Sequence, residues 1–283
     1  MGDGSSDDPT VLFLHIGKTA GATMRRALRR QYPDRLVMEL RAPAVRPGRL
    51  RRDGAVEHFA SLPEQERARP RLVVGHFTYG LHEAVPRPST YLTLLREPTA
   101  LVLSQYHHVR RHRGHLLHEQ AKAHPDLRSY VTSGLSLEMD NSQTRALAGD
   151  TTTPFGACTP QMLEMAKAHL DSAFGVVGVT ERFDESLVMM REAFGWGRLR
   201  YVPINVDRTR RDPVDDADLE LVRAHNALDL ELYAWAMRRF DETRSSIPGF
   251  DDALDRFRRD NASYRPWGRL LAAPHRLVDR LRG

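Results

Sequence analysis

The segment of residues 11–23, Val-Leu-Phe-Leu-His-Ile-Gly-Lys-Thr-Ala-Gly-Ala-Thr, constrains the fold more than any other part of the chain. Its apolar run at 11–16 predicts a short buried strand, its small residues at 17–21 predict a tight loop, and residues 22–31 predict a basic helix. Small residues let backbone N–H groups close on an anion, and the helix N-terminus adds its partial positive charge. The segment therefore predicts a phosphate-binding loop.

Lys18 is the cation of this loop, and only three of the 42 basic residues in the chain are lysines. It can reach a bound anion as a point charge, and Thr19 and Thr23 offer hydroxyl groups. A nucleoside-triphosphate P-loop requires a glycine five residues before Gly17, where this chain has Leu12 within the strand. The loop is thus too short to wrap a β-phosphate in that manner.

Apolar strands alternate with amphipathic helices along the chain. Strands are predicted at 11–16, 72–74, 91–95 and 176–179, and helices at 22–31, 63–69, 98–113, 160–172, 181–194 and 215–240. This alternation predicts an α/β fold with a mostly parallel sheet flanked by helices. The ligand of such a sheet lies beyond the carboxyl ends of its strands, where the loops after Ile16, Val74 and Leu95 meet.

The helix predicted at 215–240 is expected to bury one continuous stripe of side chains. The stripe consists of Leu219, Val222, Asn226, Leu230, Tyr233, Met237 and Phe240. Asn226 is its polar member and needs a hydrogen-bond partner if it is buried.

Three parts are predicted: a disordered N-terminus at 1–10, one domain at 11–245, and a C-terminal extension at 246–283 with a basic amphipathic helix. Leu277, Val278 and Leu281 share one face of that helix, and Pro274 limits it to about two and a half turns. This helix either lies on an anionic membrane surface or docks on the domain or on a second subunit.

The composition excludes several classes of protein. Hydrophobic residues make up 41% of the chain, too many for disorder, and no apolar run approaches the length of a membrane span. The N-terminus is acidic and unlike a signal peptide, and the single cysteine, Cys158, cannot form an internal disulfide. We therefore expect a cytoplasmic protein, peripheral at the membrane if the C-terminal helix binds lipid.

Basic residues are concentrated near the predicted loop, where residues 18–53 contain eleven basic and three acidic side chains. Such a block favours an anionic partner, namely a nucleotide, an anionic glycan, nucleic acid or a membrane surface; the alternative is a solvated face. No motif that reads RNA or DNA is present, so nucleic acid is not expected.

A second loop follows the strand predicted at 91–95. Arg96 ends this strand, Pro98 opens the next helix, and Ser104 lies eight residues after Arg96. Helical side chains lean back toward the N-terminus, so Arg96 and Ser104 can share one anionic group. Taken alone, the pair favours a structural interpretation, a salt-bridged arginine at the strand end and a buried serine.

The two loops together resemble those of carbohydrate sulfotransferases, the heparan sulfate 6-O- and 2-O-sulfotransferases most closely. The resemblance joins Leu14-His-Ile-Gly-Lys-Thr-Ala-Gly-Ala-Thr23 with Leu94-Leu-Arg-Glu-Pro-Thr-Ala-Leu-Val-Leu-Ser104, and it spans about residues 11–240. Further matching pieces are Gly75-His76, Asp140-Asn141-Ser-Gln143-Thr-Arg145, Gly178-Val-Thr-Glu-Arg182 and Asn226-Ala-Leu-Asp229-Leu-Glu-Leu-Tyr233. This family usually has Pro in place of Gly17 and Asp in place of Glu97.

The resemblance implies a donor, 3′-phosphoadenosine 5′-phosphosulfate. It assigns the 5′-phosphosulfate to the first loop and the 3′-phosphate to Arg96 and Ser104. It also places Thr209 and Arg210 in a loop that closes over the nucleotide. The first-loop residues so assigned are Gly17, Lys18, Thr19, Ala20, Gly21, Ala22 and Thr23.

Sulfuryl transfer requires a base for the acceptor hydroxyl, a cation on the leaving oxygen and donors for the equatorial oxygens. Lys18 suits the leaving oxygen, and the base is expected to be a histidine. His76 follows a strand and matches the family's catalytic histidine; His82 is the alternative, and His15 is expected to be structural. The residues predicted to contact the acceptor are His82, His108, Asn141, Gln143 and Arg145.

No step of this chemistry needs a metal ion, and none is predicted. His108, His112 and His115 could share a helix face and bind a metal, but the His-Glu-x-x-His pattern is absent, and the histidine-rich flank is better interpreted as an acceptor-binding wall.

The sequence therefore predicts a sulfotransferase whose acceptor is a glycan, a glycolipid or a small hydroxylated metabolite. The alternatives are a nucleotide-dependent phosphotransferase or kinase, which would require Mg²⁺ and ATP, and an inactive glycan-binding module. The sequence predicts neither the oligomeric state nor which hydroxyl is modified.

Overall fold

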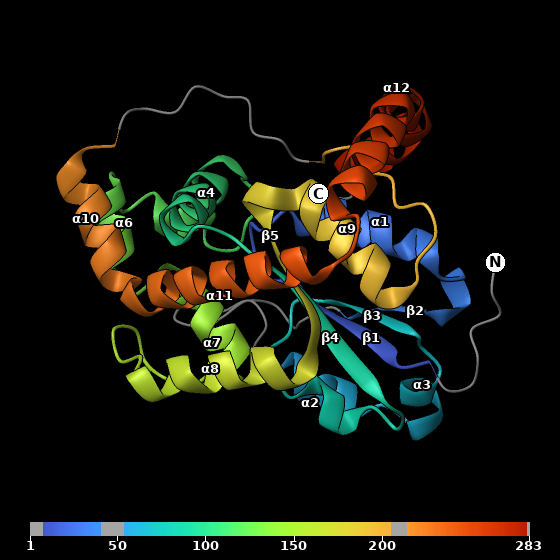
Figure 1. Ribbon diagram of the computed structural model, residues 1–283. Coiled ribbons are helices and arrows are strands. Elements are labelled where there is room, and N and C mark those ends of the chain that lie inside the picture. The colour runs from blue at the N-terminus through green and yellow to red at the C-terminus, as the bar shows by residue number, and fades with distance from the viewer. Residues whose placement is uncertain (1–7, 41–53, 205–213, 282–283) are drawn as a thin grey trace.

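Five parallel strands form one sheet in the computed structural model, which describes residues 8–40, 54–204 and 214–281, with side chains as far as Trp267 (Figure 1). The spatial order is β2-β3-β1-β4-β5. The strands are β1 (Thr10–Leu14), β2 (Val37–Leu40), β3 (Leu72–Gly75), β4 (Ser89–Leu95) and β5 (Phe174–Val179). The predicted α/β fold with a parallel sheet is confirmed.

Helices flank both faces of this sheet (Figure 1). They are α1 (Gly21–Leu28), α2 (Ala55–Ala60), α3 (Glu64–Ala68), α4 (Pro98–Arg111), α5 (His118–Ala121), α6 (Leu127–Thr132), α7 (Ser142–Ala148), α8 (Pro160–Ala173), α9 (Phe183–Phe194), α10 (Asp216–His225), α11 (Ala227–Ser246) and α12 (Phe250–Leu281). Short 3-10 turns include η3 (Leu81–Ala84), η4 (Leu137–Met139) and η5 (Thr180–Arg182).

The alternation of side chains along the strands produces two apolar cores. Val11 and Phe13 of β1 face α1, α9 and α12, whereas Leu12 and Leu14 face α2, α7 and α8. Helix α11 runs beside β5 and contributes to both cores, with Phe240 in the first and Leu232 in the second. Both faces of β1 are thus apolar and buried, as expected for a central parallel strand.

A third apolar cluster joins α4, α6 and α10 beside the sheet (Figure 1). Val102 and Tyr106 of α4 pack with Tyr130 and Val131 of α6 and with Val222 of α10. This cluster fixes α4, whose N-terminus follows β4 directly, and thereby positions the second predicted loop.

Strand β2 was not predicted, and the segment 41–71, predicted to hold one short helix, contains both α2 and α3 in its described part. Strand β2 has four residues, Val-Met-Glu-Leu, and only Leu40 of them is buried. An edge strand of this kind carries little apolar pattern, so its formation depends on pairing with β3.

The prediction of a single helix at 215–240 is wrong, because Asn226 separates two helices, α10 and α11. Asn226 is buried, and its side-chain amide donates to the carbonyls of Met139 and Val222, both at 2.9 Å. Its side-chain carbonyl accepts the backbone N–H of Asn141 at 3.0 Å. The expected partner for Asn226 is therefore present, and the bond to Val222 lies at the end of α10, while the first N–H groups of α11, those of Leu228 and Asp229, donate to the side-chain carbonyl of Asn141.

The predicted stripe changes accordingly. Of its seven residues, Val222, Asn226 and Phe240 are buried, and the other four are only half-buried. The buried positions of α11 are instead Asp229, Leu232, Ala236 and Phe240.

The boundary predicted at 245 is also wrong, since α12 begins inside the domain. Phe250, Ala253, Leu254 and Phe257 lie in the same apolar core as β1. Asn261 is buried as well, and its carbonyl accepts the backbone N–H of Tyr201 at 2.8 Å. The helix runs through position 274 to Leu281, so Pro274 does not confine it to a short terminal piece.

Disorder was predicted for residues 1–10, yet Thr10 is buried and opens β1. Residues 1–7 lie outside the described part of the chain. Among the described residues, no helix combines the length and the apolar character needed to cross a bilayer.

Candidate active site

A pocket of about 640 Å³ opens beyond the carboxyl ends of β1, β3, β4 and β5. The connection after β1 leads to one side of the sheet and the connection after β4 leads to the other, so the pocket lies at the topological switch point. Its lining consists of His15, Gly17, Lys18, Ala20, Gly21, Ala22, Thr23, Arg25, His76, Arg96, Ser104, His108, Thr180, Phe183, Tyr201, Pro203 and Ile204. Both predicted loops and His76 therefore meet in one place.

The first loop has an unusual backbone. Lys18 and Ala20 both have positive φ, 64° and 60°, a conformation that non-glycine residues adopt rarely and at a cost of about 1–2 kcal/mol. The surrounding structure must therefore hold the loop in this shape. Gly17 lies in the half-buried part of the loop, and Lys18 and Ala20 line the pocket.

The two loop threonines do not both offer hydroxyls to a ligand as expected. Thr19 is fully buried, is absent from the pocket lining, and donates its hydroxyl to the carbonyl of Ile16 at 2.8 Å. Thr23 does line the pocket, and its hydroxyl accepts the backbone N–H of Ile204 at 3.0 Å. Thr19 thus stabilises the turn.

His15 and His76 form a stacked pair at the floor of the pocket, with ring centroids 4.1 Å apart. His76 Nδ1 lies 2.8 Å from the backbone carbonyl of His15, which can only accept a hydrogen bond. The neutral His76 ring therefore carries its proton on Nδ1 and leaves Nε2 as the basic nitrogen. A Cβ at Gly21 would lie 1.7 Å from His15 Nε2, so any larger residue there would displace the His15 ring.

His15 was expected to lie within a buried strand. Strand β1 ends at Leu14, however, and His15 is half-buried and lines the pocket. The signal that could have identified it is its place as the first residue after the strand, which puts it at the sheet edge where ligands bind.

Arg96 connects the two loops. Its Nη1 donates to the backbone carbonyl of Lys18 at 2.9 Å. Its own backbone N–H and carbonyl are both bonded to the side-chain amide of Gln143, at 3.0 and 2.9 Å. Ser104 of α4 lines the same pocket. The structure therefore brings Lys18, Arg96 and Ser104 together.

Glu97 stands where the resembling family usually has Asp, and it caps α4. Its carboxylate accepts the backbone N–H groups of Thr99 at 2.9 Å and Ala100 at 2.6 Å. This residue satisfies two donors of the helix N-terminus and fixes the start of the helix that carries Ser104.

His82, the alternative base, lies outside the pocket lining. It belongs to η3, and its backbone N–H and its Nδ1 are 2.9 and 3.0 Å from the hydroxyl of Tyr91. Burial is the main cause that raises the pKa of Tyr91. These contacts support a structural role for His82.

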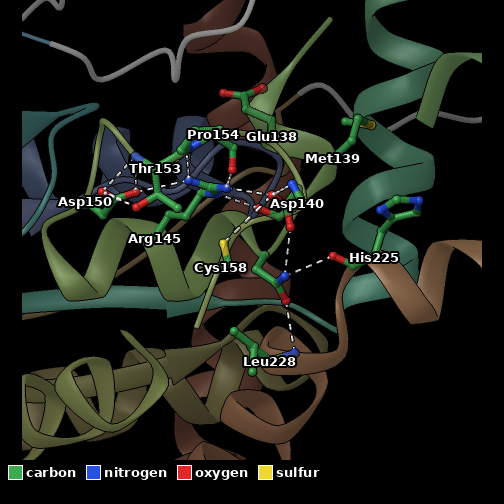
Figure 2. A network of polar contacts seen from close by, with 12 residues as sticks. Glu138, Met139, Asp140, Arg145, Asp150, Thr153, Pro154, Cys158, His225 and Leu228 are labelled. Atoms are coloured by element: carbon green, nitrogen blue, oxygen red, sulfur yellow. Dashed lines mark hydrogen bonds and ion pairs between the residues drawn. The ribbon is translucent and has the colours of Figure 1, made fainter. Parts of the chain in front are cut away.

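Three residues predicted to contact the acceptor are buried below the site instead. Arg145 is 0% exposed, and all its guanidinium donors are used by Asp140, Asp150 and the carbonyls of Thr153 and Pro154 (Figure 2). Asn141 donates to Asp140 and to the carbonyl of His225 and is 6% exposed; Gln143 is 1% exposed. This burial argues against direct contact of any of the three with an acceptor.

His108 does line the pocket, and its ring lies 4.0 Å from that of His112 and 5.6 Å from that of His115. In the described part of the chain, no group of three or more histidine, cysteine or acidic side chains is arranged to hold a metal ion. Thr209 and Arg210 lie outside the described residues.

Tyr201 and Phe183 were not singled out from the sequence, yet they line the same pocket as the first loop, together with Thr180 of the matching piece 178–182. Burial and a hydrogen bond to Asp184 raise the pKa of Tyr201 to about 12, so it stays protonated and donates to that carboxylate at 2.7 Å. Apolar and aromatic walls carry no motif, which explains why sequence patterns missed them.

The parallel sheet, the short loop after β1 and the pocket at the switch point define an α/β fold that is consistent with that of a sulfotransferase. The family model described as galactose-3-O-sulfotransferase matches residues 3–244, and the chain belongs to this family. The carbohydrate sulfotransferase class expected from the motifs is therefore confirmed. The heparan sulfate 6-O or 2-O type is not confirmed, because the family that matches is the galactose type.

A curated relative, galactose-3-O-sulfotransferase 3 of Bos taurus, is 26% identical to the chain over 239 residues. The match covers 79% of this chain and 55% of the bovine protein. The chain thus spans about half the length of the curated relative that it matches.

Proposed function

We propose that the chain is a sulfotransferase that moves the sulfuryl group of 3′-phosphoadenosine 5′-phosphosulfate to a glycan hydroxyl, with the 3-hydroxyl of galactose as the first candidate. The observation that carries the proposal is one pocket that contains Lys18, His76, Arg96 and Ser104 at the switch point of the sheet. Family membership supports the reaction class and the sugar.

The residues present fit such a donor. A pocket of about 640 Å³ is in the range of small-molecule sites. The first loop and the N-terminus of α1 supply N–H donors for the phosphosulfate, with Lys18 as the cation. Arg96 and Ser104 are the candidates for the 3′-phosphate; the same resemblance assigns Thr209 and Arg210 to the nucleotide.

In the proposed reaction, His76 Nε2 removes the proton of the acceptor hydroxyl, whose oxygen forms a bond to sulfur while the bond from sulfur to the phosphate oxygen breaks. The His15 carbonyl accepts the Nδ1 proton and so keeps Nε2 the unprotonated nitrogen of the neutral ring. Lys18 stabilises the negative charge that develops on the leaving oxygen. His108 and Arg25 line the same pocket and are candidates for acceptor contacts.

The two alternatives have distinct signatures. A kinase would need room for a longer loop, but Leu12 is fully buried within β1, which favours the shorter loop. An inactive binding module would bind glycan without depending on Lys18 or His76.

The test is to incubate the protein with labelled donor and a panel of galactose-terminated acceptors. His76→Ala should lower kcat by roughly 10²–10⁴-fold, the usual effect of losing a general base, with unchanged affinity for adenosine 3′,5′-bisphosphate. His82→Ala is the matched control and should retain activity. A larger loss of activity in His82→Ala would show that His82, and not His76, is the base. Transfer of a phosphoryl group from ATP with Mg²⁺ would instead favour the kinase.

A further inference from the structure

Three arginines line a small hollow next to the pocket. Arg26 comes from α1, Arg30 from the 3-10 turn η1 (Arg29–Gln31) that follows it, and Arg200 from the segment after α9; Thr23, Ala27, Tyr201 and Val202 complete the lining. The hollow encloses about 10 Å³, roughly the space of one oxygen atom of a bound group. Thr23 and Tyr201 also line the larger pocket, so the two spaces are adjacent.

The guanidinium groups of Arg30 and Arg200 are held close together. Arg30 and Arg200 both lie over the ring of Tyr264, 5.5 and 5.6 Å from its centroid. Arg30 Nη1 also lies 3.4 Å from the backbone carbonyl of Arg200. Two positive charges thus share one aromatic ring.

Carboxylates neutralise the neighbouring cations but not these three. Arg25 of α1 pairs with Glu39, and Arg29 of η1 lies 3.3 Å from Asp34. Within the described residues, no carboxylate is paired with Arg26, Arg30 or Arg200, and Arg200 Nε is buried without an acceptor.

Asp184, the acid that contacts Tyr201, is already engaged. It accepts the hydroxyl of Tyr201 at 2.7 Å and lies 3.8 Å from Arg258 Nε. On the other side of the Tyr201 hydroxyl, Arg265 Nη2 donates at 2.8 Å and adds one more positive charge.

Like charges gathered without a counter-charge repel one another, and an anion that binds among them removes this cost. Thr23 and Arg26 lie at i and i+3 on α1, and Arg30 follows in η1, so one face of the helix leads from the pocket toward the cluster. A group bound there can belong to a molecule whose reacting part is held in the pocket.

We propose that Arg26, Arg30 and Arg200 form an anion-binding subsite for a sulfate, carboxylate or phosphate substituent of the acceptor. This assignment deepens the proposed function and rests on it. It makes an anionic oligosaccharide, or the anionic form of a galactose-terminated one, a better acceptor than its neutral counterpart.

The experiment compares two acceptors, a neutral galactose-terminated oligosaccharide and the same molecule with one sulfate group. The wild-type protein should have the lower KM for the sulfated acceptor. Arg26→Gln combined with Arg30→Gln should raise that KM by about tenfold to a hundredfold, the range for lost hydrogen bonds to a charged group, and should leave the neutral acceptor unchanged. Arg29→Gln, next to Arg30 in η1, is the matched control and should have no effect.

Equal KM values for the two acceptors in the wild-type protein would overturn the proposal. So would weaker binding of adenosine 3′,5′-bisphosphate in the double variant, because the cluster would then serve the donor. If the double variant lost only co-sedimentation with phosphatidylserine vesicles, the cluster would be a lipid-binding surface and the proposal would also fall.

A binding measurement separates this proposal from the proposed function. Calorimetric titration of both oligosaccharides into protein saturated with adenosine 3′,5′-bisphosphate tests the subsite without turnover. If no acceptor is sulfated at all, the proposed function fails, and tighter binding of the sulfated oligosaccharide that depends on Arg26 and Arg30 would still support the subsite.

Discussion

The segment 140–145 has two interpretations, an acceptor-binding motif or an internal support, and the contacts of Arg145 distinguish them. Its Nε donates to the carbonyl of Asp140 at 2.9 Å, and its Nη2 donates to the carboxylate of the same residue at 2.6 Å. Nη1 and Nη2 together also reach Asp150 and the carbonyls of Thr153 and Pro154. The guanidinium group thus donates to five acceptor atoms, and the Arg145 side chain is fully buried.

Arg145→Met removes one partner of a buried ion pair and leaves the Asp140 carboxylate uncompensated. Such a change costs about 3–5 kcal/mol. At roughly 2–4 °C per kcal/mol for a domain of this size, the Tm should fall by roughly 6–20 °C. Arg145→Lys keeps the charge but not the planar fork of donors, so we expect an intermediate loss of about 1–3 kcal/mol.

Calorimetry and urea unfolding measure these losses, and steady-state kinetics below the lowest Tm measure activity. The control is Arg239→Met, which removes an exposed arginine paired with Asp171 and Glu242 and should leave the Tm unchanged within error. If Arg145→Lys kept the wild-type Tm and raised only the KM for the acceptor, Arg145 would be a substrate ligand and the structural interpretation would be refuted.

Three further predictions concern other parts of the molecule. Gln143→Ala leaves the backbone N–H and carbonyl of Arg96 without partners, so stability should fall by about 2–3 kcal/mol and adenosine 3′,5′-bisphosphate should bind more weakly by calorimetry; unchanged affinity would show that Gln143 does not position Arg96. Burial, aided by the charge of Asp140, raises the pKa of the Cys158 thiol to about 12, so iodoacetamide should alkylate it slowly at pH 8 and quickly in urea; fast alkylation of the folded protein would contradict its position. Removal of residues 268–283 should leave the Tm unchanged and abolish co-sedimentation with anionic vesicles if the basic end of α12 lies on a membrane, whereas a large fall in Tm would show that this end docks on the domain.

The central part of the fold could be predicted because its signals are local. The strands β1, β3, β4 and β5 are continuous apolar runs, and the loops that follow them contain the only lysine near the N-terminus, His76 and Arg96. Since all parallel strands end at the same edge, placing residues at strand ends was sufficient to bring them together.

The elements that were missed depend on partners far away in the sequence. The break at Asn226 requires the N–H of Asn141, 85 residues earlier, and a helical pattern alone carries no trace of it. Strand β2 contains Glu39, whose carboxylate pairs with Arg25 of α1, so a charged edge strand looked like part of a loop. The first half of α12 looked like an extension because the apolar surface that it covers becomes visible only when the sheet is formed.

The motif residues assigned to the acceptor illustrate a different limit. A buried arginine that satisfies an internal carboxylate and an arginine that binds a substrate have the same letter and a similar polar neighbourhood in the sequence. Only burial distinguishes them, and Arg145 is fully buried while Arg96 lines the pocket. For the same reason His82 and His76 could not be ranked by residue type, but the hydroxyl of Tyr91 engages the first and the pocket contains the second.

The buried segments nevertheless reach the candidate site through a continuous set of hydrogen bonds. The carboxylate of Asp229 in α11 accepts the first free N–H groups of α7, those of Gln143 at 3.0 Å and Thr144 at 2.7 Å. The side chain of Gln143 then fixes the backbone of Arg96.

Arg96 in turn holds the carbonyl of Lys18, the residue whose positive φ gives the first loop its shape. Because a left-handed backbone at a lysine persists only where its surroundings enforce it, these bonds stabilise the loop conformation in which its N–H groups can face an anion. The segments around Asn141 and Asp229 therefore stabilise the pocket through these hydrogen bonds, although neither residue lines it.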